Sequence, residues 1–317
     1  MDADVDASAG AGDEAGEDMA SMGNSKWGEE VRSSRCPGRP PRSRGPGGRP
    51  HLGRQTDTAE GAAGHRPGAR CRVTAGRYGA GMTDFVLVPG AWLGAWAWDE
   101  VTPLLREAGH GVHPLSLSGL AEKADRKGAP APGQETHVRD VVDEIERLDL
   151  REVALVGHSY AGIPVCQAAQ RLGGRLAHVV LVDANVPADG EPFLSALRPE
   201  GRAELEAALA AHGGDWPPPA AAALAGQDLT DEQLTLFTAR ATPHPGASLT
   251  EPAALARPLT SLPATYVQCL RDHPELRADV APLVTGGHWR LTRLDTGHWP
   301  MLSRPRELAG VLLGAVR

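Results

Sequence analysis

The chain has 317 residues, of which 41% are hydrophobic, and its formal net charge is −8 at pH 7. This length suffices for one large α/β domain or two smaller ones, and the acidic balance argues against nucleic acid as the main partner. No apolar run approaches the roughly 20 residues of a membrane span, so no membrane partner is expected. The scattered cysteines predict neither a disulfide framework nor a zinc site, and they fit a reducing cytoplasm. These cysteines are Cys36, Cys71, Cys166 and Cys269.

Residues 1–81 do not have the composition of a folded domain. The segment is rich in glycine, arginine and proline, as in RCPGRPPRSRGPGGRP, and almost no large aliphatic side chain is present to offset the entropy cost of ordering. We therefore predict that residues 1–81 are disordered, and we hypothesise that the natural chain starts at Met82. Peptides from before Met82 in the native protein would contradict the second hypothesis.

From residue 83 onward, short apolar runs alternate with segments of helical spacing. The runs predicted as buried strands are residues 85–88, 112–115, 153–156, 178–182, 264–269 and 288–294. The segments predicted as helices in this part are residues 93–110, 135–148, 163–172, 275–283 and 303–316, with Ser303 as the N-cap of the last. Such alternation predicts an α/β fold with a mostly parallel, doubly wound sheet.

The alternation stops between about residues 187 and 259. Helical pieces at 193–212 and 231–240 are separated there by loops such as WPPPAAAALAG. We interpret this insertion as a helical lid, because it enters at the end of the sheet where ligands of open α/β sheets bind. The alternative is a helical excursion without any gating role. A single domain is then predicted over residues 82–317.

The strand at 153–156 leads directly into GHSYAG at residues 157–162 and then into a helix. We interpret this as a nucleophile elbow of the Gly-x-Ser-x-Gly type, in which a sharp strand-to-helix turn exposes a serine hydroxyl. Glycine is needed where a side chain would collide with the neighbouring strand or helix, and the serine itself is held in a strained conformation. The alternative is a glycine-rich turn whose serine caps the helix.

A serine nucleophile needs a base within hydrogen-bond reach, and the base needs a carboxylate to orient it. His298 follows the last predicted strand, and Asp272 follows the strand before it. We predict Ser159 as nucleophile, His298 as base and Asp272 as acid, with Asp183 as the alternative acid because it also ends a strand. Asp295 is too close to His298 along the chain to orient it easily.

Two backbone N–H groups should stabilise the developing oxyanion, and we predict those of Tyr160 and Ala91. We predict an apolar acyl pocket lined by five large apolar side chains. The alternative is that these side chains belong to the hydrophobic core, as most such residues do. These are Trp92, Trp96, Leu197, Leu236 and Phe237. No metal and no organic cofactor is expected.

Four segments together resemble the plant-type methyl esterase and hydroxynitrile lyase branch of the α/β-hydrolases and its bacterial esterase-like relatives. They are FVLVPGAWLGAWAWDEVTPLLREAGH, GHSYAG, YVQCLRD and DTGHWPM, and the resemblance extends over residues 82–317. It implies the α/β-hydrolase fold and the same roles for Ser159, Asp272, His298, Ala91 and Tyr160. One departure is Pro89-Gly90, where the family usually has His-Gly to support the oxyanion loop.

The resemblance favours a serine hydrolase that cleaves a small to medium ester through an acyl-serine intermediate. Lyase chemistry is disfavoured, since Gly90 and Trp299 stand where cyanohydrin-cleaving members typically carry threonine and lysine. A slow or non-catalytic small-molecule binding module is the alternative from another class. The sequence determines neither the natural substrate nor the choice among ester, thioester, lactone and C–C bond hydrolysis. The oligomeric state also stays open, with a homodimer as one option.

Overall fold

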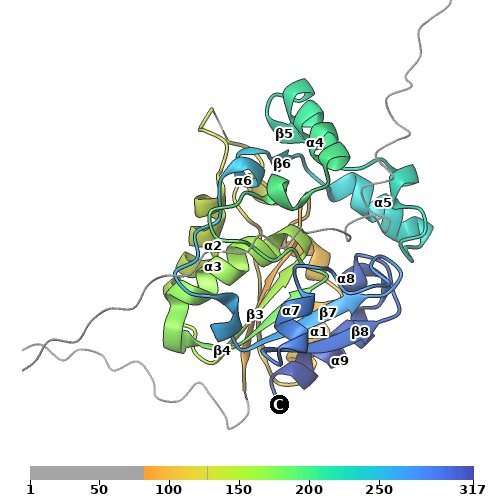
Figure 1. Ribbon diagram of the computed structural model, residues 1–317. Helices are drawn as coiled ribbons and strands as arrows, with labels where there is room; N and C mark the ends of the chain where they lie inside the picture. Colours follow the sequence, from red (N-terminus) through yellow and green to blue (C-terminus); the bar gives the residue numbers. More distant parts are fainter. Residues whose placement is uncertain (1–81, 127) are drawn as a thin grey trace, which may run out of the picture. The chain divides into compact units, whose positions relative to one another are not determined.

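The computed structural model describes residues 82–126 and 128–317, so the disorder predicted for residues 1–81 lies outside it. All six predicted strands are present, and they form one parallel sheet in the order β2-β1-β3-β4-β7-β8 (Figure 1). The strands are β1 (Asp84–Val88), β2 (Gly111–Pro114), β3 (Val153–His158), β4 (Leu176–Val182), β7 (Ala264–Cys269) and β8 (Trp289–Leu294). The predicted mostly parallel, doubly wound sheet is therefore confirmed.

Helices cover both faces of this sheet. One face is covered by α2 (Gln134–Arg147) and α3 (Gly162–Leu172), which pack against each other. The other face is covered by α1 (Val101–Glu107) and α9 (Pro305–Ala315), which also pack together. Short helices complete this part: η2 (Ala95–Trp98), η3 (Ala121–Lys123), η4 (Ser159–Ala161), η5 (Gly173–Arg175), α7 (Ala281–Thr285) and α8 (Pro300–Ser303). In the described ranges, no helix is both long and apolar enough to cross a membrane.

Strand β1 is apolar from Phe85 to Val88 because both faces of the sheet are buried there. In β1, Phe85 and Leu87 belong to the hydrophobic cluster that contains the buried side chains of α1 and α9. Val86 and Val88 belong to the cluster on the opposite face, with the buried side chains of α2 and α3. Successive side chains of a strand point to opposite faces, so a sheet covered on both faces requires uninterrupted apolar runs.

The sheet register aligns the strand ends that bear the predicted site residues. His158, the last residue of β3, is the register partner of Val182, the last residue of β4. Ser159 and Asp183 follow these two positions directly, and both have a positive φ, +52° and +44°. Parallel pairing therefore places the two residues side by side at the carboxyl edge of the sheet.

The insertion predicted as a lid lies between β4 and β7. Its elements are η6 (Phe193–Ala196), α4 (Pro199–Ala211), β5 (Asp215–Trp216), η7 (Ala221–Leu224), α5 (Asp231–Arg240), β6 (His244–Pro245), α6 (Ala247–Thr250) and η8 (Leu259–Ser261). β5 and β6 pair as a separate antiparallel sheet. Helix α5 begins with a capping box, in which Thr230 accepts from the Gln233 amide and the Gln233 side chain binds back to Thr230.

Two predicted helices differ from the structure near the C-terminus. The helix predicted at 275–283 is only α7, which starts at Ala281, since Pro282 fits the first turn of a helix but not its interior. Ser303 is not the N-cap of the last helix but the final residue of α8, and its hydroxyl binds the Trp299 carbonyl. Helix α9 then begins at Pro305, with Arg304 at its N-cap position.

Gly162 is required by a close approach of two backbone segments. A Cβ atom there would lie 2.3 Å from the Asn185 carbonyl oxygen and 2.8 Å from the Ala184 Cβ. We expect Gly162→Ala to lower the free energy of unfolding by about 2 kcal/mol, because neither neighbour can move independently of the strand end. Urea unfolding measures this effect.

Gly310→Ala in helix α9 is the matched control, since a Cβ at Gly310 meets nothing within 4 Å. The same change there should stabilise the protein by about 0.5 to 1 kcal/mol, because alanine loses less backbone entropy in a helix. Equal effects of the two substitutions would contradict the close approach at Gly162.

Candidate active site

Ser159 stands at the sharp turn between β3 and α3, where its φ of +52° is unusual for a residue with a side chain. Gly157 lies in the last part of β3, and a Cβ there would be 3.0 Å from the Val165 Cγ2 atom and 3.1 Å from the Ala161 carbonyl oxygen. The motif is in fact Gly-x-Ser-x-Ala, and the second glycine, Gly162, comes one position later than the expected pattern. The strained backbone of Ser159 and the close packing around Gly157 and Gly162 are typical of a nucleophile elbow.

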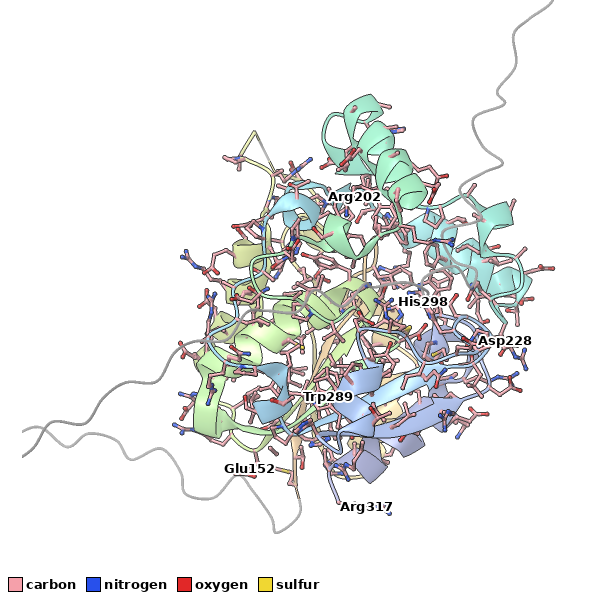
Figure 2. The ribbon with its side chains drawn as sticks, viewed as in Figure 1. Glu152, Arg202, Asp228, Trp289, His298 and Arg317 are labelled. Carbon is pink, nitrogen blue, oxygen red and sulfur yellow. The ribbon has the colours of Figure 1, made fainter. Side chains whose placement is uncertain are left out.

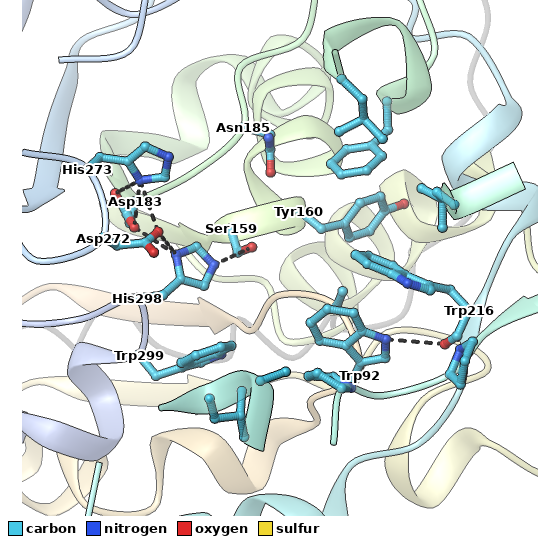
Figure 3. A pocket seen from close by; sticks show the side chains of 18 of the residues that line it. Trp92, Ser159, Tyr160, Asp183, Asn185, Trp216, Asp272, His273, His298 and Trp299 are labelled. Atoms are coloured by element: carbon cyan, nitrogen blue, oxygen red, sulfur yellow. Dashed lines mark hydrogen bonds and ion pairs between the residues drawn. The ribbon is translucent and has the colours of Figure 1, made fainter. Parts of the chain in front are cut away.

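His298, in the loop between β8 and α8, faces Ser159 and two carboxylates (Figure 3). Its Nε2 atom lies 2.9 Å from the Ser159 hydroxyl. Its Nδ1 atom lies 2.7 Å from Asp183 Oδ2 and 3.0 Å from Asp272 Oδ2. The structure thus brings together the predicted nucleophile, base and acid, and it adds the alternative acid at the same imidazole. Asp295, in contrast, is 74% exposed in its side chain and pairs with an arginine.

The electrostatics keep both carboxylates ionised and make His298 more basic. Burial raises the pKa of Asp183 and Asp272, but hydrogen bonds and charge from His298 and His273 outweigh it, so both pKa values lie below the ordinary range. Burial lowers the pKa of His298, whereas the two carboxylates raise it, and the net direction is upward from 6.5. The two carboxylates therefore stabilise the protonated form of His298.

His158 supports the loop after β1, which lacks the histidine that the resemblance leads one to expect at Pro89. The Gly90 amide donates to His158 Nδ1 at 3.2 Å, and His158 Nε2 donates to the His298 carbonyl at 2.8 Å. Burial, followed by the charge of His298, lowers the pKa of His158 to about 3, so this imidazole is neutral. A Cβ at Gly90 would lie 2.7 Å from the Ser159 Cβ. Glycine is therefore needed where the loop passes the serine.

The predicted oxyanion donors, Ala91 and Tyr160, both line the pocket beside Ser159. In the described part of the chain, neither backbone N–H donates to another protein group. The Tyr160 side chain is fully buried and its hydroxyl lies 2.9 Å from His137 Nδ1, which fixes the start of the elbow helix against α2. Oxyanion donors must be fixed and free of other partners, so Ala91 and Tyr160 stay the predicted donors.

A pocket of about 100 Å³ opens at Ser159 between the sheet edge and the insertion. Figure 2 shows His298 below the helices of the insertion, at this boundary. Of the predicted pocket residues, Trp92 and Leu197 line the pocket. The insertion contributes an apolar wall of Phe193, Leu197, Leu205, Trp216, Pro217 and Leu224. The Trp92 indole donates to the Trp216 carbonyl at 3.2 Å, which ties the oxyanion loop to this wall.

Three predicted pocket residues lie elsewhere. Trp96 is buried in the α1–α9 face of the core, where the Arg240 guanidinium stands 5.0 Å from its ring centre. Phe237 is fully buried and packs edge-on against Trp299, behind the pocket wall. Leu236 precedes it on α5 and is 38% exposed, since consecutive helical positions point about 100° apart. Apolar character alone could not distinguish wall residues from core residues.

Gln227, in the loop between η7 and α5, is a site residue that sequence reasoning missed. Its side chain donates to Asp272 Oδ1 at 3.0 Å and accepts from the His298 amide at 2.7 Å. Its own carbonyl oxygen would lie 2.3 Å from a Cβ placed at Gly297. One glutamine of the insertion thus bridges the acid and the base. A glutamine in a loop without regular structure has no periodicity or motif that could have revealed it.

Asp183, Asp272 and His273 also bring ligand-type atoms within 4.8 Å of one another. His273 Nδ1 lies 3.0 Å from Asp272 and 3.3 Å from Asp183, so these atoms already have partners within the cluster. We therefore assign these atoms to ion pairs and derive no metal chemistry from them.

The sequence profile of the Alpha/beta hydrolase family matches residues 85–311, which is most of the chain and includes every site residue named above. The chain belongs to the α/β-hydrolase family. Among its curated relatives is a carbendazim hydrolyzing esterase from Nocardioides sp., 31% identical over 72% of this chain and 97% of the relative. Methylesterase 9 from Arabidopsis thaliana is 27% identical over 73% of this chain and 97% of the relative.

Solved structures agree with this α/β-hydrolase fold. An extracellular alpha/beta-hydrolase from a Paenibacillus species superposes with a TM-score of 0.64 at 24% identity, over 74% of this chain and 99% of the other. Polyneuridine aldehyde esterase superposes with a TM-score of 0.58 at 20% identity, over 74% of this chain and the whole of the other. At these identities the two structures support the fold alone.

Gln227→Ala should lower kcat/KM of this α/β-hydrolase by about tenfold, because Asp272 loses a hydrogen-bond donor and the His298 loop loses its anchor. Steady-state kinetics on an activated ester measure the loss. The matched control is Gln233→Ala in the same insertion, whose side chain binds the Leu302 carbonyl away from Ser159. Equal losses in the two variants would show that Gln227 acts only through the stability of the insertion.

Proposed function

We propose that this α/β-hydrolase is a serine carboxylesterase that cleaves small to medium esters through an acyl-serine intermediate. The observation that supports this most directly is the geometry at His298, whose two ring nitrogens contact the Ser159 hydroxyl and the buried carboxylates. A serine in a strained turn, an oriented base and two free amides in one pocket are the requirements of acyl transfer. The names of the curated relatives, an esterase and a methylesterase, also support ester cleavage.

In the proposed reaction, His298 takes the proton of Ser159 while the serine oxygen attacks the ester carbonyl. The N–H groups of Ala91 and Tyr160 receive the negative charge on the carbonyl oxygen. His298 then gives its proton to the departing alcohol, which leaves the acyl group on Ser159. A water molecule deprotonated by His298 attacks this acyl group, and the acid departs as Ser159 regains its proton.

The pocket supports an apolar substrate portion next to the reacting carbonyl. Trp92, Phe193 and Trp216 form aromatic pairs in one wall, with centroid distances of 4.1 Å for Trp92–Trp216 and 6.4 Å for Phe193–Trp216. Rigid aromatic side chains bury large apolar surfaces at low entropy cost. We infer that aromatic or branched aliphatic esters are preferred over charged ones. The cytoplasmic location expected from the cysteine pattern stays a prediction.

A fluorophosphonate probe tests the proposal on the full chain, because it reacts covalently with activated serines. We expect one probe per chain, and peptide mass mapping should locate it on Ser159. A folded chain that is not labelled would contradict the proposal and would favour the small-molecule binding module. An ester panel of increasing acyl size would then identify the preferred substrate class in the labelled protein.

A further inference from the structure

The reaction proposed above uses His298 but not the second imidazole beside it. His273 Nδ1 lies 3.0 Å from Asp272 Oδ2 and 3.3 Å from Asp183 Oδ1, and its side chain is only 10% exposed. The same two carboxylates receive the Nδ1 atom of His298. Figure 3 shows the two imidazoles on either side of the carboxylate pair, with His273 farther from Ser159. Two imidazoles therefore share two carboxylates in one buried cluster.

Two adjacent buried carboxylates repel each other unless a cation stands between them. The side chain of Asp183 is fully buried and that of Asp272 is 3% exposed, so water contributes little to the compensation. Among residues 82–126 and 128–317, no lysine or arginine forms an ion pair with either carboxylate. Arg277, which also lines the pocket, pairs with Asp279 at 2.8 Å. Charge from Arg277 reaches Asp183 without a direct contact. Among the described residues, the cationic side chains that contact both carboxylates are the two imidazoles.

We propose that His273 is a positioning residue that remains an imidazolium and keeps both Asp183 and Asp272 ionised, so that two carboxylates orient and stabilise His298. The charge count follows directly. Two carboxylates and one imidazolium carry one net negative charge, as a single aspartate does beside the base of a Ser-His-Asp site. The cluster becomes neutral when His298 takes the proton of Ser159. This inference rests on the proposed function, since His298 is its general base.

Other charges around the two imidazoles do not change this count. His158, which faces His298 from the end of β3, is neutral, and the charge of Arg277 is matched by Asp279. Burial lowers the pKa of His273, but hydrogen bonds and charge from Asp183 and Asp272 outweigh burial, so the pKa of His273, like that of His298, lies above 6.5. Because His298 must be neutral before it takes the Ser159 proton, the charge that compensates the two carboxylates in that state falls on His273.

The pH dependence of kcat/KM gives the test a definite sign. A base is inactive while protonated, so kcat/KM rises with pH through the pKa of His298, which the carboxylates place above 6.5. His273→Asn keeps a donor near the carboxylates but removes the charge. It should move this rise upward by about 1 to 2 pH units, because the more negative cluster holds the His298 proton more tightly.

A double-mutant cycle then separates charge from structure. Asp183→Asn alone leaves a neutral cluster and should lower kcat/KM by about 10- to 100-fold. The double variant His273→Asn/Asp183→Asn restores one net negative charge, so it should recover at least about tenfold over Asp183→Asn, with the pH rise returning toward that of the unmodified protein. His288→Asn, at an exposed histidine, is the matched control and should leave the pH rise in place.

Additive losses in the double variant, or an unmoved pH rise in a folded His273→Asn protein, would overturn the proposal. Histidine ¹⁵N NMR on the unmodified full chain provides a measurement that needs no folded variant. We expect both ring nitrogens of His273 to carry protons from about pH 6 to pH 8. A neutral His273 in this range would also overturn the proposal. Absence of fluorophosphonate labelling would instead overturn the proposed esterase function, so the two failures are distinguishable.

Discussion

Ser159→Ala should lower kcat for ester hydrolysis by about 10⁴- to 10⁶-fold, because removal of the nucleophile leaves only binding and the oxyanion donors. The proposed reaction forms its covalent bond at the Ser159 oxygen, and His298 Nε2 lies 2.9 Å from that atom. Without the hydroxyl, His298 has no proton to accept at the start of the reaction. Initial rates on an activated ester, with active protein counted by titration, measure the loss.

Ser261→Ala is the control for this prediction, since Ser261 is exposed and its hydroxyl binds the Pro258 carbonyl far from the pocket. It should retain full activity. The melting temperature of Ser159→Ala should stay close to that of the unmodified chain, because the backbone of the turn is held by its neighbours. Residual hydrolysis above about 1% in the folded Ser159→Ala protein would mean that esters are cleaved by another route.

The second large effect is expected when both carboxylates at His298 are replaced. Asp183→Asn/Asp272→Asn should lower kcat by about 10⁴-fold, because His298 Nδ1 then has no anion to orient it or to stabilise its charged form. Each single variant should lose only about 10- to 100-fold, since the remaining carboxylate still contacts Nδ1. The contact distances of 2.7 Å for Asp183 and 3.0 Å for Asp272 allow either one to serve.

Asp295→Asn is the matched control for the carboxylate variants. Asp295 lies three positions before His298 but points to solvent and pairs with Arg271. Its replacement should leave kcat unchanged within about twofold, as an exposed ion pair contributes little. A loss of about 10⁴-fold in one single variant, with no loss in the other, would identify one aspartate as the sole acid and the other as a structural residue.

Local patterns in the sequence were sufficient to predict the core of the fold. The apolar runs found the central strands, which are buried on both faces, and also the edge strands β2 and β8, whose runs are weaker because these strands are partly exposed. They were less reliable for short helices, as at α7, where Pro282 sets the start of the helix more strongly than the apolar spacing does. The elbow was recognised from small residues in a turn. Its second glycine, Gly162, nevertheless stands one position later than the Gly-x-Ser-x-Gly pattern requires.

The pocket could not be predicted in the same way. Trp92 and Trp96 are both aromatic and only four positions apart, yet the first lines the pocket and the second packs in the core. Trp92 has a positive φ of +66°, which turns the loop at this point. The insertion adds a further difficulty, because Gln227 reaches the site only through the path of a loop without regular structure. Side-chain chemistry gives no information on such a path.

The sequence by itself determined which polar residues lie at or shortly after the carboxyl ends of strands: Ser159, Asp183, Asp272 and His298. It did so because burial imposes apolar runs, and a polar residue that ends such a run must lie at the edge of the sheet. Only the tertiary structure decided how these residues combine. β4 and β7 are neighbours in the sheet although the whole insertion separates them along the chain. Their pairing places both aspartates at one imidazole, and this depends on which strands pair across the insertion, which no local pattern encodes.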